Sequence, residues 1–208
     1  MLSALIFAGG RASRLGGLNK ALLEVGGSTI IARTLAAVRP LVDECILLTN
    51  DVALADVGDV GDVRLVFDPT PHAGVLPALA AGLEAAAGEL CLAVACDMPF
   101  VSTRLFAQLL ELQRHVNADV VIPRSAGFLE PMHAVYHREP VLQAIRAALG
   151  RGDQRMISYF GDVTVHEVPE AVWRLADASG GAFFNVNTPD ELERAQWIAA
   201  RSSSSSPI

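Results

Sequence analysis

The 208-residue chain lacks any long hydrophobic run, although half of its residues are apolar. Glycine, proline or charged residues interrupt each apolar segment well before the ~20 residues that a membrane-spanning helix needs. The first residues, MLSALIFAGG, have no basic segment before the apolar run and no cleavage-site pattern after it. We therefore expect a buried first strand rather than a signal peptide, and no association with a membrane.

Basic residues and paired cysteines are also scarce. The 16 Lys and Arg are outnumbered by 23 Asp and Glu, and the net charge of −7 argues against a nucleic-acid-binding protein, which usually presents a basic face. Cys45, Cys91 and Cys96 lie in apolar segments and none belongs to a CxxC pair. This usage indicates small buried side chains in a reducing, cytoplasmic compartment. A catalytic thiol at Cys96 stays an alternative, but the sequence shows no histidine beside it.

Short apolar segments of strand length alternate with amphipathic segments of helix length. We expect strands at 2–8, 45–49, 64–67, 91–95, 119–123, 133–136 and 163–168, and helices at 29–39, 75–87, 103–114, 138–149, 154–160 and 189–201. This alternation predicts an α/β fold of three layers, with a mostly parallel central sheet covered by helices on both faces. We expect one domain over residues 1–200 and a disordered Ser-rich tail over 201–208.

A glycine-rich segment, FAGGRASRLGGLNKALLEVGG at 7–27, follows the first expected strand. Gly9 and Gly10 would let backbone N–H groups approach a phosphate, Arg14 offers a planar fork and Lys20 a compact charge. The alternative is a glycine-rich turn with solvated cations, but the position directly behind a strand favours a polyphosphate site. The GxxxxGK[ST] and GxGxxG patterns are both absent, which argues against P-loop ATPases and Rossmann dehydrogenases.

Polar residues follow three further expected strands. In parallel sheets, ligands bind beyond the carboxyl ends of the strands. The rim defined in this way comprises Ala8, Gly9, Gly10, Asn50, Asp68 and Asp97. A carboxylate at such a rim suits Mg²⁺, although Asn50, Asp68 and Asp97 also have the alternative of being turn residues. Gly74 directly precedes the helix expected at 75–87, whose first N–H groups would favour an anion; the alternative is a simple helix-entry turn.

Five segments, in order along residues 2–200, resemble motifs of the molybdenum cofactor guanylyltransferase family of nucleotidyltransferases. They are AGG-x-x-S-R-L-G-G-x-x-K (8–20), GVLPAL (74–79), ACDMPF (95–100), EPMHAVY (130–136) and FFNVNTPDEL (183–192). The family has a nucleotide-diphospho-sugar transferase fold with a Rossmann-like nucleotide-binding half. The resemblance implies transfer of GMP from GTP to the terminal phosphate of molybdenum-bearing molybdopterin, with Mg²⁺ as cofactor. It also implies partner proteins that deliver molybdopterin or receive the dinucleotide.

By this resemblance the catalytic residues are Arg14, Lys20 and Asp97, with Asp97 as the Mg²⁺ ligand. The nucleotide-binding residues would be Phe7, Ala8, Gly9, Gly10, Lys20, Asn50, Asp68, Gly74 and Asp97. Asn185 and Asn187 would lie near the second substrate, with both side chains on one face if the segment is extended. Thr188, Pro189 and Glu191 have the pattern of a helix capping box.

Some features depart from the family pattern or leave alternatives open. Asn19 stands where the family commonly has Asp, and Val75, Pro77 and Ala78 replace the family's Pro, Ala and Gly. Arg124, His133 and Arg155 are open as contacts to the second substrate, with His133 more typical of a core or edge histidine.

Three other functions compete with guanylyl transfer. A cytidylyltransferase is the first, but by resemblance AGG rather than AAG after the first strand favours GTP. Other small-phosphate nucleotidyltransferases share the loop, and NVNTP together with the short chain argues against them. A nucleotide-sensing or docking module would need neither Asp97 nor a region for a second substrate.

Overall fold

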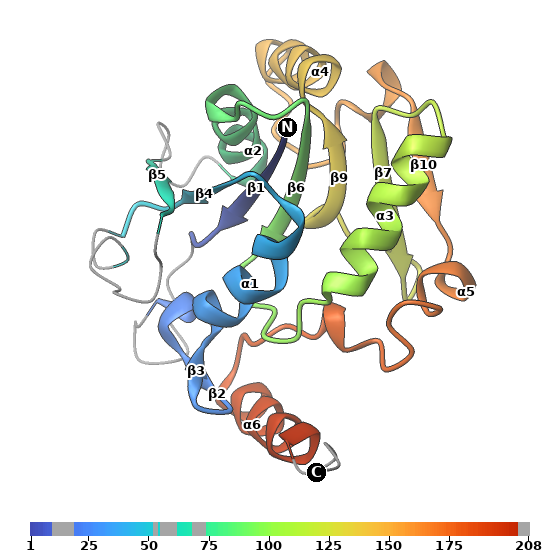
Figure 1. The fold of residues 1–208 in the computed structure, drawn as a ribbon. Helices are drawn as coiled ribbons and strands as arrows, with labels where there is room; N and C mark the ends of the chain where they lie inside the picture. Colours follow the sequence, from blue (N-terminus) through green and yellow to red (C-terminus); the bar gives the residue numbers. More distant parts are fainter. Residues whose placement is uncertain (10–18, 52–53, 55–61, 68–73, 204–208) are drawn as a thin grey trace.

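The computed structural model describes residues 1–9, 19–51, 54, 62–67 and 74–203, with only the backbone of 202 and 203 (Figure 1). Among these residues, one sheet has the strand order β10-β7-β9-β6-β1-β4-β5, with β8 paired to β7. The strands are β1 (Leu2–Phe7), β4 (Glu44–Leu48), β5 (Arg64–Val66), β6 (Leu90–Ala95), β7 (Val120–Ser125), β8 (Phe128–Leu129), β9 (His133–His137) and β10 (Val165–Val168).

The sheet is mostly parallel, as predicted. β6, β1, β4 and β5 run parallel, as do β7 and β10, while β9 runs antiparallel between β6 and β7. Phe7 in β1 is level with Leu48 in β4 and with Ala95 in β6. The carboxyl ends of these three central strands therefore share one edge of the sheet.

Helices cover both faces, which confirms the three-layer α/β prediction. Alternate residues of β1 face opposite sides, so Ala4 and Ile6 join one core cluster and Leu5 and Phe7 the other. The first cluster is covered by α1 (Ile30–Val38), α3 (Thr103–His115) and α5 (Glu170–Trp173), and the second by α2 (Val75–Ala85) and α4 (Arg138–Gly150). Figure 1 shows α1 and α3 on the near side of the sheet.

The last helix, α6 (Pro189–Ser203), packs away from the main sheet. Ala195 and Ala199 of α6 join a third cluster with Val25 and Ile30, beside the hairpin of β2 (Glu24–Val25) and β3 (Ser28–Thr29). Figure 1 shows α6 beneath this hairpin. The packing brings the segment before α6 next to η2, a short 3-10 helix at Lys20–Leu22.

Two expectations were wrong in detail. Residues 154–160 form turns that lead into a 3-10 helix, Phe160–Asp162, instead of an α-helix. The Asp153 carboxylate accepts the N–H of Arg155 at 3.1 Å, and such a local bond competes with helix formation. The expected tail begins too early, because α6 continues through Arg201 to Ser203, and residues 204–208 lie outside the described part.

The short elements were not predicted. They are β2, β3, β8, α5 and the 3-10 helices at Lys20–Leu22, Arg39–Leu41 and Gly181–Phe183. Two to four residues are too few to show a hydrophobic period. No helix in the described ranges is long and apolar enough to cross a bilayer.

Candidate active site

The carboxyl ends of the central strands carry several of the predicted residues. The Ala8 N–H donates to Leu48 O and the Cys96 N–H to Phe7 O, each at 2.9 Å, so pairing continues to the edge of the sheet. Gly9 and Asn50, just beyond β1 and β4, are exposed. Phe7 and Ala8 are themselves buried. Asp97, two residues beyond β6, completes this edge.

Lys20, Asp97 and Asn187 meet at this edge although they come from distant parts of the chain. The Lys20 ammonium lies 3.4 Å from Asp97 Oδ2 and also donates to Asn187 Oδ1. The N–H of Val186 donates to the backbone oxygen of Asp97 at 2.8 Å, which ties the two segments together. The Lys20 and Asp97 side chains are 21% and 25% exposed, so a ligand can reach both. Lys20 is the only lysine in the sequence.

The N-terminus of α6 holds Asn187 in place through the predicted capping box. The Glu191 carboxylate accepts the N–H groups of Asn187 (2.7 Å) and Thr188 (2.9 Å), and Thr188 Oγ1 accepts the Glu191 N–H at 3.3 Å. The Asn187 N–H is the largest cause of a lowered pKa for Glu191. Asn185 behaves differently: the segment is not a strand, and Asn185 Nδ2 donates back to Phe183 O at 3.3 Å.

Of the remaining predicted residues, Gly74 lies at the start of α2, and three others lie outside the described residues. Gly74 caps α2 with φ +101°, which favours glycine, and a Cβ there would meet no atom within 4 Å. It is exposed, so its surroundings leave room for a ligand. Gly10, Arg14 and Asp68 fall outside the part of the chain that the structure describes.

His133 and Cys96 are core residues, which confirms the burial expected for both. The His133 ring is fully buried, stacks on Phe106 with ring centroids 4.3 Å apart, and meets the Phe183 ring edge-on at 5.1 Å. Burial lowers the pKa of His133 to about 3 and raises the pKa of Cys96. Because a catalytic thiol needs a lowered pKa, these surroundings do not support a nucleophilic Cys96.

Arg124 and Arg155 are engaged with carboxylates on the surface. Arg124 Nη2 lies 2.7 Å from the carboxylate of Glu167, and Arg155 Nη2 lies 2.5 Å from that of Asp153. A role for either arginine at a second substrate would require these ion pairs to open.

Sequence reasoning missed two polar residues beside the site, Thr49 and Asp51, which lie just after β4. Thr49 Oγ1 donates to the backbone oxygen of Ala8, and Asp51 Oδ2 accepts from Asn19 Nδ2. Short polar residues after a strand resemble ordinary turn residues, so only their position beyond β4 could have drawn attention to them.

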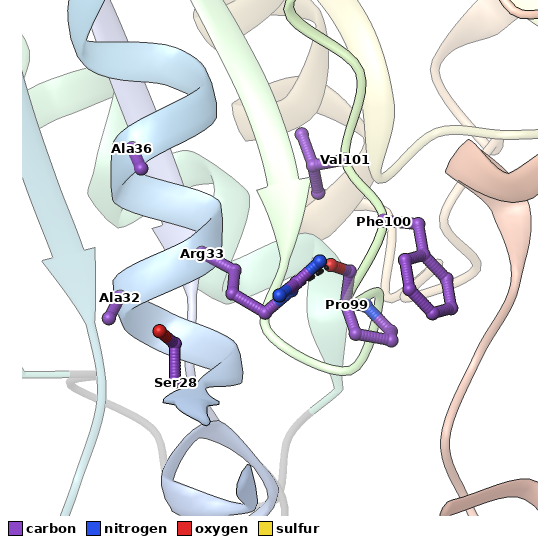
Figure 2. Close-up of a pocket in the computed structure, with 7 residues that line it drawn as sticks. All are labelled: Ser28, Ala32, Arg33, Ala36, Pro99, Phe100 and Val101. Carbon is purple, nitrogen blue, oxygen red and sulfur yellow. Dashed lines mark hydrogen bonds between the residues drawn. The ribbon is translucent and has the colours of Figure 1, made fainter. Parts of the chain in front are cut away.

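A separate pocket of about 340 Å³ lies between α1 and the segment after β6 (Figure 2). Arg33 crosses it, with Nε donating to Pro99 O at 2.8 Å and the guanidinium over the Phe100 ring. None of the predicted site residues lines this pocket, so it is distinct from the edge that carries Lys20 and Asp97.

Comparison with known proteins shows the family to which the chain belongs. Residues 4–166 match the family model of the MobA-like NTP transferase domain. The chain is 34% identical to a probable molybdenum cofactor guanylyltransferase of Pelotomaculum thermopropionicum, over 96% of this chain and 94% of that protein. It is 31% identical to the molybdenum cofactor guanylyltransferase of Desulfosudis oleivorans, over 94% of each.

A solved structure shares the fold. It is the molybdopterin-guanine dinucleotide biosynthesis protein A of Archaeoglobus fulgidus, with a TM-score of 0.80 and 24% identity over 96% of this chain and 99% of that one. The family model and the curated relatives, each of which matches most of the sequence, lead to one assignment. The chain belongs to the MobA-like NTP transferase domain family, among the molybdenum cofactor guanylyltransferases.

Proposed function

We propose that the protein transfers GMP from GTP to the terminal phosphate of molybdenum-bearing molybdopterin, releasing pyrophosphate. The observation that carries this proposal is the meeting of Lys20, Asp97 and Asn187 at the carboxyl edge of the sheet. The names of the relatives, which match over more than nine-tenths of the chain, support the choice of substrates.

The reaction needs positioning and charge neutralisation more than proton transfer. The attacking phosphate is already an anion, so it needs no general base to attack the α-phosphorus of GTP. Lys20 would offset the negative charge of the triphosphate and of the departing pyrophosphate. Gly9, together with Gly10 and Arg14, would contact phosphate oxygens. Asn50, Asp68 and Gly74 would border the nucleotide.

The oxygen donors at the site fit a magnesium ion that arrives with the nucleotide. Mg²⁺ usually takes one or two carboxylates and completes its shell with phosphate oxygens and water. The Asp97 carboxylate supplies such a ligand and already faces a cation, the Lys20 ammonium. When bound, Mg²⁺ would neutralise phosphate charge and orient the α-phosphate. Asn187, on the other side of Lys20, would contact the second substrate, as would Asn185.

The direct test is product identification. The purified protein is incubated with molybdenum-loaded molybdopterin, Mg²⁺ and each of the four ribonucleoside triphosphates in turn, and the products are measured by mass spectrometry and a pyrophosphate assay. We expect molybdopterin guanine dinucleotide and pyrophosphate with GTP. The cytosine dinucleotide instead would show a cytidylyltransferase, and nucleotide binding without pyrophosphate release would show a sensor.

Replacing Lys20 by Ala should abolish most activity while leaving the fold intact. We expect kcat/KM for dinucleotide formation to fall roughly 100-fold or more, as on loss of one charge-stabilising group. Thermal unfolding should change little, because a partly exposed ion pair contributes little stability. The matched control is Arg151→Ala, which removes the exposed pair with Asp162 at the end of α4. Near-normal transfer by Lys20→Ala would contradict the assignment.

A further inference from the structure

The Asn19 side chain connects the lysine-bearing segment to two strands of the sheet. Its Oδ1 accepts the N–H of Ala21 at 3.0 Å, which caps η2. Its Nδ2 donates to Asp51 Oδ2 at 3.0 Å, beyond β4, and to Ala8 O at 3.4 Å, beyond β1. The Asn19 side chain thus both accepts and donates hydrogen bonds, and these bonds fix the backbone next to Lys20.

The partners of Asn19 are themselves fixed. Thr49, which is almost fully buried, donates through Oγ1 to Ala8 O at 3.2 Å and accepts the Asp51 N–H at 3.0 Å. Ala8 is anchored in turn by its own N–H bond to Leu48 O. This hydrogen-bond network therefore connects η2 to the carboxyl ends of β1 and β4. The Lys20 side chain extends from η2 toward Asp97, which lies beyond the neighbouring strand β6.

We propose that Asn19 is a positioning residue that holds Lys20 at the phosphate site by bonding the Asp51 carboxylate. This inference rests on the proposed function only in assigning Lys20 to the triphosphate. A side chain at 19 must both accept from Ala21 and donate to Asp51, and an amide does both. Aspartate at this position would keep the cap on η2 but would set two carboxylates 3.0 Å apart, and their repulsion would displace the segment.

The test is a double-mutant cycle between positions 19 and 51. Asn19→Asp places the two carboxylates face to face, whereas Asn19→Asp combined with Asp51→Asn restores a donor and an acceptor with their positions exchanged. Asp51 also interacts beyond Asn19, so Asp51→Asn alone measures the cost of changing that residue. Lys20→Arg identifies the lysine signal in the spectra.

The first measurement observes Lys20 itself and needs no substrate. Because the chain has a single lysine, reductive methylation with ¹³C-formaldehyde labels only Lys20 and the N-terminal amine. We expect the Lys20 methyl signal of Asn19→Asp to shift away from the wild-type position and the double variant to return to it. An unchanged signal in Asn19→Asp would overturn the proposal, whatever reaction the protein catalyses.

The second measurement follows Mg-GTP affinity and the kinetic constants for dinucleotide formation, with thermal unfolding recorded in parallel. We expect Asn19→Asp to lose roughly tenfold in Mg-GTP affinity, typical of a lost charge-assisted bond, and the double variant to recover to within about twofold of Asp51→Asn. Equal impairment of Asn19→Asp and the double variant would also overturn the proposal. If wild type makes no dinucleotide, the proposed function fails, while the Lys20 signal still decides the role of Asn19.

A second variant keeps the proposal testable if Asn19→Asp does not fold. Asn19→Ser retains an N-cap acceptor for Ala21 and introduces no charge, but it removes the amide donor to Asp51. Its Lys20 signal should shift in the same way. A wild-type signal in Asn19→Ser would count against the proposal as firmly as one in Asn19→Asp.

Discussion

His133 shows how complete burial changes the chemistry of a single residue. Among the residues that the structure describes, neither ring nitrogen has a hydrogen-bond partner, and the ring is enclosed between Phe106 and Phe183. An unpaired buried polar group costs about 1–3 kcal/mol, and a charged one costs more. The folded state therefore strongly prefers the neutral ring, because burial outweighs the opposing attraction of Asp177.

Stability should consequently fall in mild acid. Burial lowers the pKa of His133 from its ordinary 6.5 to about 3, so between these values the unfolded chain binds a proton that the folded chain does not. The contribution of the neutral ring is fully present above pH 6.5 and is lost as the pH falls below it. Between pH 7 and pH 5 this loss amounts to about 2 kcal/mol.

Replacing His133 by Leu should remove that part of the pH dependence. We expect the free energy of unfolding, measured by urea titration at pH 7 and pH 5, to fall about 2 kcal/mol less in the variant than in wild type. Phe128→Leu, an exposed substitution in β8 that removes no titratable group, is the control and should keep the wild-type pH dependence. Identical behaviour of the two variants would refute the assignment to His133.

Two helix N-termini in this protein have similar caps but different surroundings. Thr188 Oγ1 accepts a backbone N–H at the start of α6, and Ser102 Oγ does the same for α3 at 3.2 Å. Only the first lies beside a predicted site residue, because the α6 capping box also holds the N–H of Asn187. The N-cap of α3 therefore only stabilises its helix, whereas the capping box of α6 stabilises its helix and also holds the predicted site residue Asn187.

Removing each cap should separate these two roles. Thr188→Ala and Ser102→Ala should each lower the free energy of unfolding by about 1 kcal/mol, the usual cost of a lost N-cap. Only Thr188→Ala should also reduce kcat/KM for nucleotidyl transfer, by roughly tenfold, because it loosens Asn187 next to Lys20. If both variants lost activity equally, the effect would belong to general stability and not to the placement of Asn187.

Across the whole molecule, the two ends of the sheet differ: a hydrogen-bond network lies at the amino end, and the predicted site lies at the carboxyl end. At the amino end, Glu44 Oε1 accepts from Ser3 Oγ (2.6 Å) and from the Ala87 N–H (2.7 Å), and Ser3 Oγ accepts the Gly88 N–H at 2.9 Å. Burial alone would raise the pKa of Glu44, but these hydrogen bonds lower it below its ordinary value. The carboxyl end, one strand length or roughly 20 Å away, carries the predicted site.

A substitution at the amino end should therefore affect stability without affecting the site. A Cβ at Gly88 would lie 2.8 Å from the Ser3 backbone nitrogen and 2.9 Å from Leu90 O, so Gly88→Ala should cost about 2 kcal/mol of unfolding free energy. Nucleotide affinity of the folded protein should be unchanged. Gly150→Ala, where a Cβ meets no atom within 4 Å, should not lower the free energy of unfolding and should leave the affinity unaltered. A large loss of affinity in Gly88→Ala at temperatures where it is folded would show that the two ends are coupled.

Local patterns predicted the long elements because each strand and helix carries its own hydrophobic period. They also placed Gly9, Asn50 and Asp97 beyond the ends of strands, because the order of residues along the chain is enough to show which residue follows a strand. They failed at 154–160, where a carboxylate bonds the nearby backbone, and at two-residue strands that have no period.

The amino-acid sequence by itself determined the α/β alternation and the residues at the carboxyl edge, because both follow from neighbours along the chain. Only the tertiary structure decided that Lys20 meets Asp97 and Asn187, 77 and 167 residues away, and that Asn19 bonds Asp51. These contacts depend on β6, β1 and β4 lying side by side and on α6 packing against the β2–β3 hairpin. Such an arrangement comes from the burial of whole faces, which no short stretch of sequence specifies.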